Sequence, residues 1–195
     1  MPRKKTFSFK NLIHKNFRRL EQFIFLLKSL LTPRQFIYLS CVLVGISSAL
    51  AVIILKTFAH WVFKSSQKLD DILHLPFSNS TLPIIGIIIT VIIIKKVLDG
   101  SIEKGTSQIM YAVAKKRGIM PRKQMFAQII TSSFTVGMGG SAGLESPITI
   151  TGAAFGSNYA QNYRLSYKDR TLLLACGVAA GIGAAFNAPI AGVLF

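Results

Sequence analysis

The chain has 195 residues, of which 51% are hydrophobic and 15% charged, and its formal net charge is +16. Soluble domains carry about 25% charged residues, so this composition argues against a soluble protein and indicates a chain that lies largely in a bilayer. Such a positive charge suits nucleic acid, an anionic membrane surface or basic cytoplasmic loops. No nucleic-acid-binding module accompanies the basic residues, so the expected partner is the lipid bilayer and not nucleic acid.

The first 31 residues predict a basic tail followed by a surface helix. Apolar residues recur at spacings of three and four between Phe9 and Leu27, which places them on one helical face with basic residues beside it. Such a helix is typical of the cytoplasmic membrane interface. A mitochondrial transit peptide is the alternative for this segment, although serine is sparse in it. Thr32 and Pro33 then end this helix and start the next one.

Three apolar stretches predict membrane spans, and shorter broken segments follow them. Residues 36–55 carry no charge and are long enough to cross the hydrocarbon core, with Gly45 and Ser48 among the small residues suited to close helix packing. The β-branched run around 84–94 could suggest a strand, but an open strand leaves its backbone unsatisfied in lipid, so we expect a helix. The whole region 32–195 is expected to be a partial transmembrane domain. Its predicted elements are spans at 33–63, 81–98 and 122–138, half-helices at 105–115 and 146–163, and helices at 169–186 and 188–195.

The loops between these elements predict the orientation. Residues 65–80 are interpreted as a polar loop between the first two spans. From Lys95 to Lys123 the chain is strongly basic, and two spans separate this region from the basic tail. Both regions therefore fall on one side of the membrane, which the positive-inside rule makes cytoplasmic. Cys41 and Cys176 lie inside apolar stretches, so we expect small buried hydrophobes there and no disulfide framework or metal site.

The stretch from Gly139 to Pro147 is the candidate functional site. Its small residues let a backbone approach an ion closely, and Pro147 suits the first turn of a helix. We expect the N–H groups at this helix start to point outward and, with the positive end of the helix dipole, to bind an anion. The residues of this expected anion site are Gly143, Leu144, Glu145, Ser146 and Ile148.

Glu145 is the only acidic residue between Glu103 and Asp169. A lone carboxylate at an anion site would compete with the anion when ionised and withdraw when protonated. The alternative is that Glu145 only caps the helix and that the glycines only allow close packing. Residues 137–142 also fit the dinucleotide pattern G-x-G-x-x-A, but no βαβ unit precedes them, and the Gly-Lys-Ser/Thr ending of a P-loop is missing.

Two motifs in this chain resemble the chloride channel and transporter (CLC) family. Gly-Leu-Glu-Ser-Pro at 143–147 is similar to the CLC signature Gly-Arg-Glu-Gly-Pro, with Leu144 and Ser146 as departures from it. The run at 179–195 is similar to the family's Ala-Ala-Gly-x-x-Ala-Ala-Phe-Asn-Ala-Pro-x-Ala-Gly almost letter for letter. The resemblance implies an all-α integral membrane protein, a CLC-type multi-helix bundle with broken and re-entrant helices. It also implies that Glu145 is the gating glutamate and proton acceptor, with the backbone amides around it facing the anion.

The first CLC signature, Gly-Ser-Gly-Ile-Pro, is poorly kept. Its counterpart begins at Glu103, and Gly105 aligns with its second glycine, which puts Lys104 where an anion-touching serine usually sits. Lys104 is then either one more cytoplasmic charge or a cation beside the central anion, and ion selectivity depends on which. The residues expected to bind the anion in this segment are Lys104, Gly105, Thr106 and Ser107.

The resemblance also implies a function and a protein larger than this chain. CLC subunits consist of two inverted halves, so this chain is similar to an N-terminal half and needs a C-terminal half to complete a pathway. We expect transport of chloride, or another halide, by a channel or proton-coupled exchanger that is a homodimer in a bacterial-type plasma membrane. No nucleophile–base pair, metal cluster or cofactor motif is visible, so we expect neither an enzyme nor a cofactor. The alternative is a membrane-anchored interaction or lipid-binding protein without transport activity.

Overall fold

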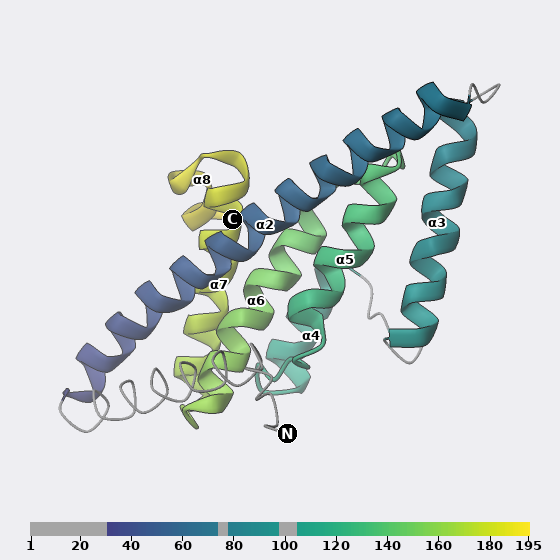
Figure 1. Ribbon diagram of the computed structural model, residues 1–195. Coiled ribbons are helices and arrows are strands. Elements are labelled where there is room, and N and C mark those ends of the chain that lie inside the picture. The colour runs from purple at the N-terminus through teal and green to yellow at the C-terminus, as the bar shows by residue number, and fades with distance from the viewer. Residues whose placement is uncertain (1–30, 74–77, 98–104) are drawn as a thin grey trace, which may run out of the picture. The chain divides into compact units, whose positions relative to one another are not determined.

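The computed structural model describes residues 31–73, 78–97 and 105–195, and these stretches contain helices and no strand. The chain divides into two compact units, Met1–Ser40 and Cys41–Phe195, and the tertiary contacts described below belong to the second unit. Of the surface helix predicted over 9–31, all but Leu31 lies outside the described residues. In chain order (Figure 1) the helices are α2 (Pro33–Leu73), α3 (Ser78–Val97), α4 (Ser107–Lys115), α5 (Gln124–Gly137), α6 (Glu145–Asn162), α7 (Tyr167–Phe186) and α8 (Pro189–Leu194).

α2 is longer than the span expected at 33–63. The helix continues through polar residues to Leu73, and α3 begins at Ser78, so the polar loop predicted over 65–80 is wrong for most of its length. Polar side chains do not by themselves stop a helix, because ending one usually takes a proline or a glycine. Along this stretch the first such residue is Pro76.

Two of the described helices, Pro33–Lys68 and Tyr167–Phe186, are long and apolar enough to cross a membrane. In addition, α2 and α3 leave large apolar side chains exposed, among them Ile46, Leu50 and Ile88. Exposed apolar surface on this scale is typical of proteins whose surface is covered by lipid or by another protein segment.

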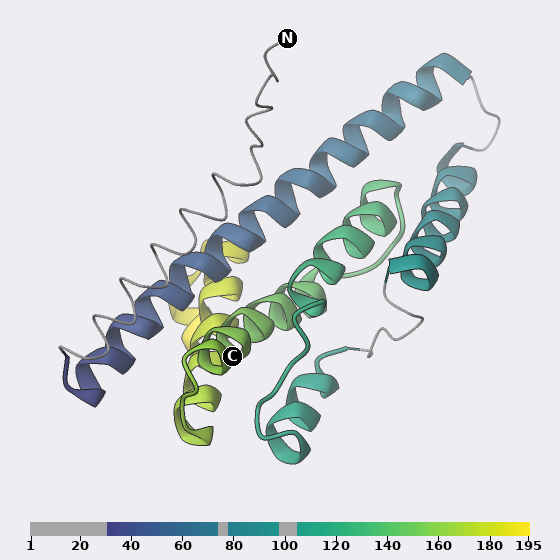
Figure 2. The same cartoon turned by 60° about the horizontal axis from the view of Figure 1, so that its bottom comes forward.

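α6 and α7 form the closest helix pair of the second unit. They lie side by side in Figures 1 and 2 and run in opposite directions, since Gly152 meets Gly177 and Gly156 meets Leu173. A Cβ added to Gly156 would lie 2.1 Å from the Leu173 carbonyl oxygen, and one added to Gly152 would lie 2.3 Å from the Gly177 oxygen. Only glycine permits such backbone contact, and most of α6 is buried as a result.

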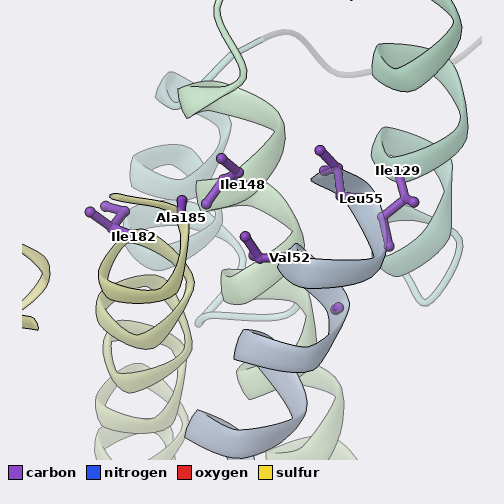
Figure 3. Close-up of a cluster of buried hydrophobic side chains, with 7 residues drawn as sticks. Val52, Leu55, Ile129, Ile148, Ile182 and Ala185 are labelled. Carbon is purple, nitrogen blue, oxygen red and sulfur yellow. The ribbon is translucent and has the colours of Figure 1, made fainter. Parts of the chain in front are cut away.

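α2 packs against this pair through its small residues. A Cβ added to Gly45 would lie 3.7 Å from the Ala180 Cβ, and a Cβ added to Gly177 would lie 3.2 Å from Ser48 Oγ. The packing role predicted for Gly45 and Ser48 is therefore confirmed. A buried group of side chains, which we call the four-helix cluster, then joins α2, α5, α6 and α7 (Figure 3). It consists of Ala51, Val52, Leu55, Ile129, Ile148, Ile182 and Ala185.

α3 packs along α5. The Oγ1 atoms of Thr90 and Thr135 lie 3.0 Å apart within hydrogen-bonding distance. One turn earlier on α3, a Cβ added to Gly86 would lie 2.8 Å from the Met138 Cβ. The two helices are thus held together by a hydroxyl contact and by a close approach at a glycine.

α4 and the loop after it are held on α6. Ser157 Oγ donates to the Gly118 carbonyl (2.6 Å), and the Met120 N–H donates to Ser157 Oγ (2.9 Å). Ile109 of α4 packs against a second buried cluster, which contains Ile150 of α6. The beginning of α4 thus lies against the first half of α6, and the loop after α4 is bound to the second half of α6.

Basic side chains gather at one end of the second unit, which we call the basic end. Arg122 Nη2 donates to Asn162 Oδ1 at the end of α6 (2.5 Å), and Arg170 Nη1 donates to the Arg117 carbonyl (3.1 Å). The loop between α4 and α5 therefore lies beside the end of α6 and the start of α7. The basic end comprises Lys115, Lys116, Arg117, Arg122, Lys123, Arg164, Lys168 and Arg170.

Candidate anion-binding site

The glycines at the end of α5 reverse the chain before α6. The Gly139 N–H donates to the Val136 carbonyl (3.0 Å) and the Gly140 N–H to the Thr135 carbonyl (2.9 Å). Gly139 has φ +89°, and a Cβ on Gly140 would lie 2.5 Å from the Thr135 oxygen, so both positions require glycine. Gly143 differs from them, because a Cβ added there would meet no heavy atom within 4 Å.

α6 begins at Glu145 and leaves backbone donors free. Leu144 occupies the N-cap position, and its side chain forms no capping hydrogen bond. Within the part of the chain that the structure describes, the N–H groups of Leu144, Glu145 and Ser146 have no acceptor. The expectation that the Ile148 N–H also points out of the helix start is wrong, because it donates to the Leu144 carbonyl (3.0 Å) and closes the first turn.

The side chains of this first turn have different surroundings. Leu144 packs against the four-helix cluster, and Ile148 is buried within it. Glu145 is exposed, and no described residue forms a hydrogen bond or an ion pair with its carboxylate. The alternative in which this carboxylate caps the helix therefore lacks the hydrogen bond that a cap requires. The turn is anchored by its apolar residues and leaves one carboxylate beside three free amides.

The start of α4 provides the other predicted residues. Gly105 has φ +73° with open space around it, and its carbonyl accepts the Gln108 N–H (3.2 Å). Thr106 and Ser107 are exposed, and Thr106 makes no side-chain cap. Lys104 lies outside the described residues. The predicted set is thus divided between two helix starts, and Ile109 of α4 packs against the cluster that contains Ile150 of α6.

One charged group near the start of α6 was not predicted as a site residue. Lys56 Nζ donates to the Ala185 carbonyl in the last turn of α7 (2.5 Å). Ala185 belongs to the same four-helix cluster that Leu144 packs against. The sequence marks Lys56 only as the first cation after the uncharged run 36–55. A cation in that position could equally mark the end of a membrane span.

The described residues contain no group of three or more His, Cys, Asp or Glu side chains that could hold a metal ion. Cys41 and Cys176 are free thiols that are half-buried, more open than the buried positions expected for them. They are neighbours, Cys41 on α2 and Cys176 on α7.

Comparison with known proteins identifies a family that this chain matches. The family described as "Voltage gated chloride channel" matches residues 85–195, which include both helix starts. The chain is 36% identical over 92 residues to the H(+)/Cl(−) exchange transporter ClcA of Salmonella arizonae, a match that covers 47% of this chain and 20% of that protein. It is 39% identical over 90 residues to the chloride channel protein CLC-c of Arabidopsis thaliana, covering 40% of this chain and 12% of that protein.

A ClcB-like protein of Ralstonia nicotianae is 38% identical over 96 residues, covering 47% of this chain and 22% of that protein. The matched part of this chain thus spans about a fifth or less of these relatives' length. The family matches more than half of this chain, and none of these relatives is named as an enzyme. With its all-helical architecture and both motif-bearing helix starts inside the matched region, the chain belongs to the voltage-gated chloride channel (CLC) family.

Proposed function

We propose that this chain forms part of a transmembrane chloride pathway and that the first turn of α6 is an anion site. The observation that carries the proposal is the set of three amides, at 144–146, that lack acceptors among the described residues at the positive end of an 18-residue helix. α6 is held against α7 by backbone contacts at Gly152 and Gly156. The three N–H groups therefore keep their orientation when an anion binds. The names of the relatives support chloride as the anion.

Glu145 is the gate in this proposal. Its carboxylate is itself an anion and stands at the first residue of α6, within reach of the same amides that would bind chloride. An ionised Glu145 therefore competes with chloride for those amides. Protonation removes the negative charge and the competition, and in an exchanger the same group carries the proton.

The start of α4 is the second element of the proposed pathway. Its contributors are Gly105, Thr106 and Ser107, with Lys104 as the predicted residue before them. The contact of Ile109 with the cluster around Ile150 supports a shared site for α4 and α6. Gly105 also supports a shared site. Its backbone is left-handed, and because glycine has no side chain, an ion can approach that backbone closely.

The proposed placement in the membrane follows from charge. The basic end is rich in Lys and Arg, so the positive-inside rule makes it cytoplasmic, and the N-terminus is proposed to lie on that side too. The start of α6 and the end of α7 then face the opposite side. A homodimer in a bacterial-type plasma membrane, with further chain completing each pathway, is the proposed assembly.

The first test is chloride binding to the purified chain in detergent, measured by calorimetry with gluconate as the background anion. We expect heat of binding from the wild-type chain and a several-fold tighter affinity for Glu145→Gln, because the competing carboxylate is gone. Asp169→Asn is the matched control, since Asp169 is also in the first turn of a helix but is held by Ser166. Absence of chloride binding to the wild-type chain would refute the proposal.

The second test separates channel from exchanger. A subunit containing this chain, reconstituted in liposomes, is expected to pass chloride. Proton movement coupled to chloride, lost in Glu145→Gln, identifies an exchanger, whereas chloride flux without it identifies a channel.

A lipid-binding protein without transport activity is a second candidate, favoured by the concentration of cations at the basic end. It predicts that charge-neutral variants of Arg117 and Arg122 weaken binding to anionic vesicles, while no chloride flux occurs in any variant. Chloride flux from the reconstituted subunit excludes it.

A further inference from the structure

The ammonium of Lys56 has a defined position in the fold. Its Nζ atom donates to the Ala185 carbonyl across 129 positions of sequence, at a distance of 2.5 Å. The residue before it, Leu55, is fully buried in the four-helix cluster (Figure 3). The backbone of Lys56 is therefore fixed by Leu55, while its side chain is exposed. An ammonium has three N–H donors, so a single bond to Ala185 leaves donors free for another partner.

The register of α6 on α7 places this charge at the start of α6. Gly156 meets Leu173, Gly152 meets Gly177, and Ile148 contacts Gly181, so each turn along α6 moves one turn back along α7. One more turn in this register pairs Ala185 with Leu144. Lys56 Nζ therefore lies at the level of the free amides.

The charge matters there because two helix ends of opposite polarity meet. The start of α6 carries a partial positive charge that favours an anion, whereas the end of α7 carries a partial negative charge that repels one. Lys56 binds a carbonyl in that last turn of α7, so its full positive charge outweighs the local negative end. Without it, an anion approaching the α6 amides would meet the uncompensated negative end of α7.

The cations of the basic end and Lys64 are less suitably placed. Those of the basic end lie beside the end of α6 and the start of α7, at the other end of these helices. Lys64 lies about two turns further along α2 than Lys56, about 12 Å along the helix axis. Val62, two residues before Lys64, contacts Gly137 at the end of α5.

We infer that Lys56 is a specificity-determining residue of the anion site, a fixed cation that draws halide to the α6 amides and offsets the negative end of α7. This inference rests on the proposed chloride function. It assigns to α2 a part in the pathway that lies outside both sequence motifs. A lysine that only caps α7 would instead affect folding and leave the anion affinity unchanged.

The experiment compares Lys56→Met, which keeps the length of the side chain, with Lys56→Arg and with Lys64→Met as the matched control. Chloride affinity is measured by calorimetry on the purified chain at two concentrations of sodium gluconate, and thermal stability is measured in parallel. Charges are screened over about 30 Å at 0.01 M salt but over about 3 Å at 1 M. We expect Lys56→Met to weaken chloride binding about fivefold at 0.01 M and less than about twofold at 1 M.

Lys56→Arg is expected to bind chloride within about twofold of wild type, and Lys64→Met to match wild type. If Lys56→Met lowers stability but leaves chloride affinity and its salt dependence unchanged, the inference is overturned and Lys56 is a cap. The inference is also overturned if Lys56→Met changes neither quantity, and Lys56 is then neither a cap nor a cation of the anion site. Absence of chloride binding to the wild-type chain is a different result, because it removes the proposed function and the inference with it.

Discussion

Glycine has different roles at the interface between α6 and α7 and in the turn that starts α6. At the interface, a Cβ on Gly156 would lie 2.1 Å from a backbone oxygen, so the glycine is there to let two helices touch. At the turn, a Cβ on Gly143 would meet nothing within 4 Å, so that glycine is not required by crowding. α6 is therefore in backbone contact with α7 at Gly156, whereas the turn that starts it has open space around Gly143.

The difference separates two explanations that the sequence left side by side. Close packing accounts for Gly152, Gly156 and Gly177, and backbone conformation accounts for Gly139. Neither accounts for Gly143, which precedes amides and a carboxylate that have no partner among the described residues. An open turn of this kind suits the proposed anion site, and the backbone contacts at Gly152 and Gly156 keep the rest of α6 rigid.

The largest effect is expected from Gly156→Ala. The added methyl would overlap the Leu173 carbonyl, and a backbone atom cannot move aside without separating α6 from α7. We expect a loss of about 3 kcal/mol or more in the free energy of unfolding, measured by denaturant titration in detergent micelles. A loss below about 0.5 kcal/mol would show that the two helices are not in backbone contact.

A smaller loss is expected from Gly105→Ala, for a different reason. The space around Gly105 is open, but its φ of +73° is unfavourable for a residue with a Cβ. We expect a cost of about 1–2 kcal/mol from backbone strain alone, measured in the same titration. An unchanged unfolding free energy would mean that the start of α4 adopts another backbone conformation.

Gly45→Ala is expected to change stability slightly and in the opposite direction. The new Cβ would lie 3.7 Å from the Ala180 Cβ, an ordinary contact, and alanine favours the helix more than glycine does. We expect a gain of up to about 1 kcal/mol, visible as a higher midpoint of thermal unfolding. A clear loss would place α2 closer to α7 than the structure does.

The smallest effect on stability is expected from Gly143→Ala, the direct counterpart of Gly156→Ala. With open space and no positive φ, the substitution should change the free energy of unfolding by less than about 0.5 kcal/mol. Circular dichroism during the same titration provides the measurement. A loss as large as that of Gly156→Ala would remove the contrast between the open turn and the locked interface.

Much of the fold follows from local sequence. The uncharged run at 36–55 requires a long helix, Pro147 suits the first turn of α6, and Gly45 and Ser48 already indicated a packing face. The polar loop over 65–80 was wrong because polar residues were taken as a sign of irregular structure, although no proline or glycine interrupts the helix before Pro76.

The candidate site was only partly predictable, because some of its residues are adjacent in the sequence and others are not. Four consecutive residues, Gly143 to Ser146, were assigned to one site because they share one turn, and their binding of an anion stays a prediction. Ile148 was assigned a free N–H, whereas the structure pairs it with the Leu144 carbonyl, since the helix begins at Glu145. Lys56 carried no local signal that distinguished a pathway cation from the end of a span.

By itself the sequence determined the helices, their apolar faces and the place of Glu145 at a helix start, because each depends on residues a few positions apart. Only the tertiary structure decided that Gly152 touches Gly177 and that Lys56 binds Ala185. Those contacts join distant segments, and they form because α6 and α7 approach to backbone contact in one register. That register places the end of α7, where Lys56 binds, at the level of the first turn of α6.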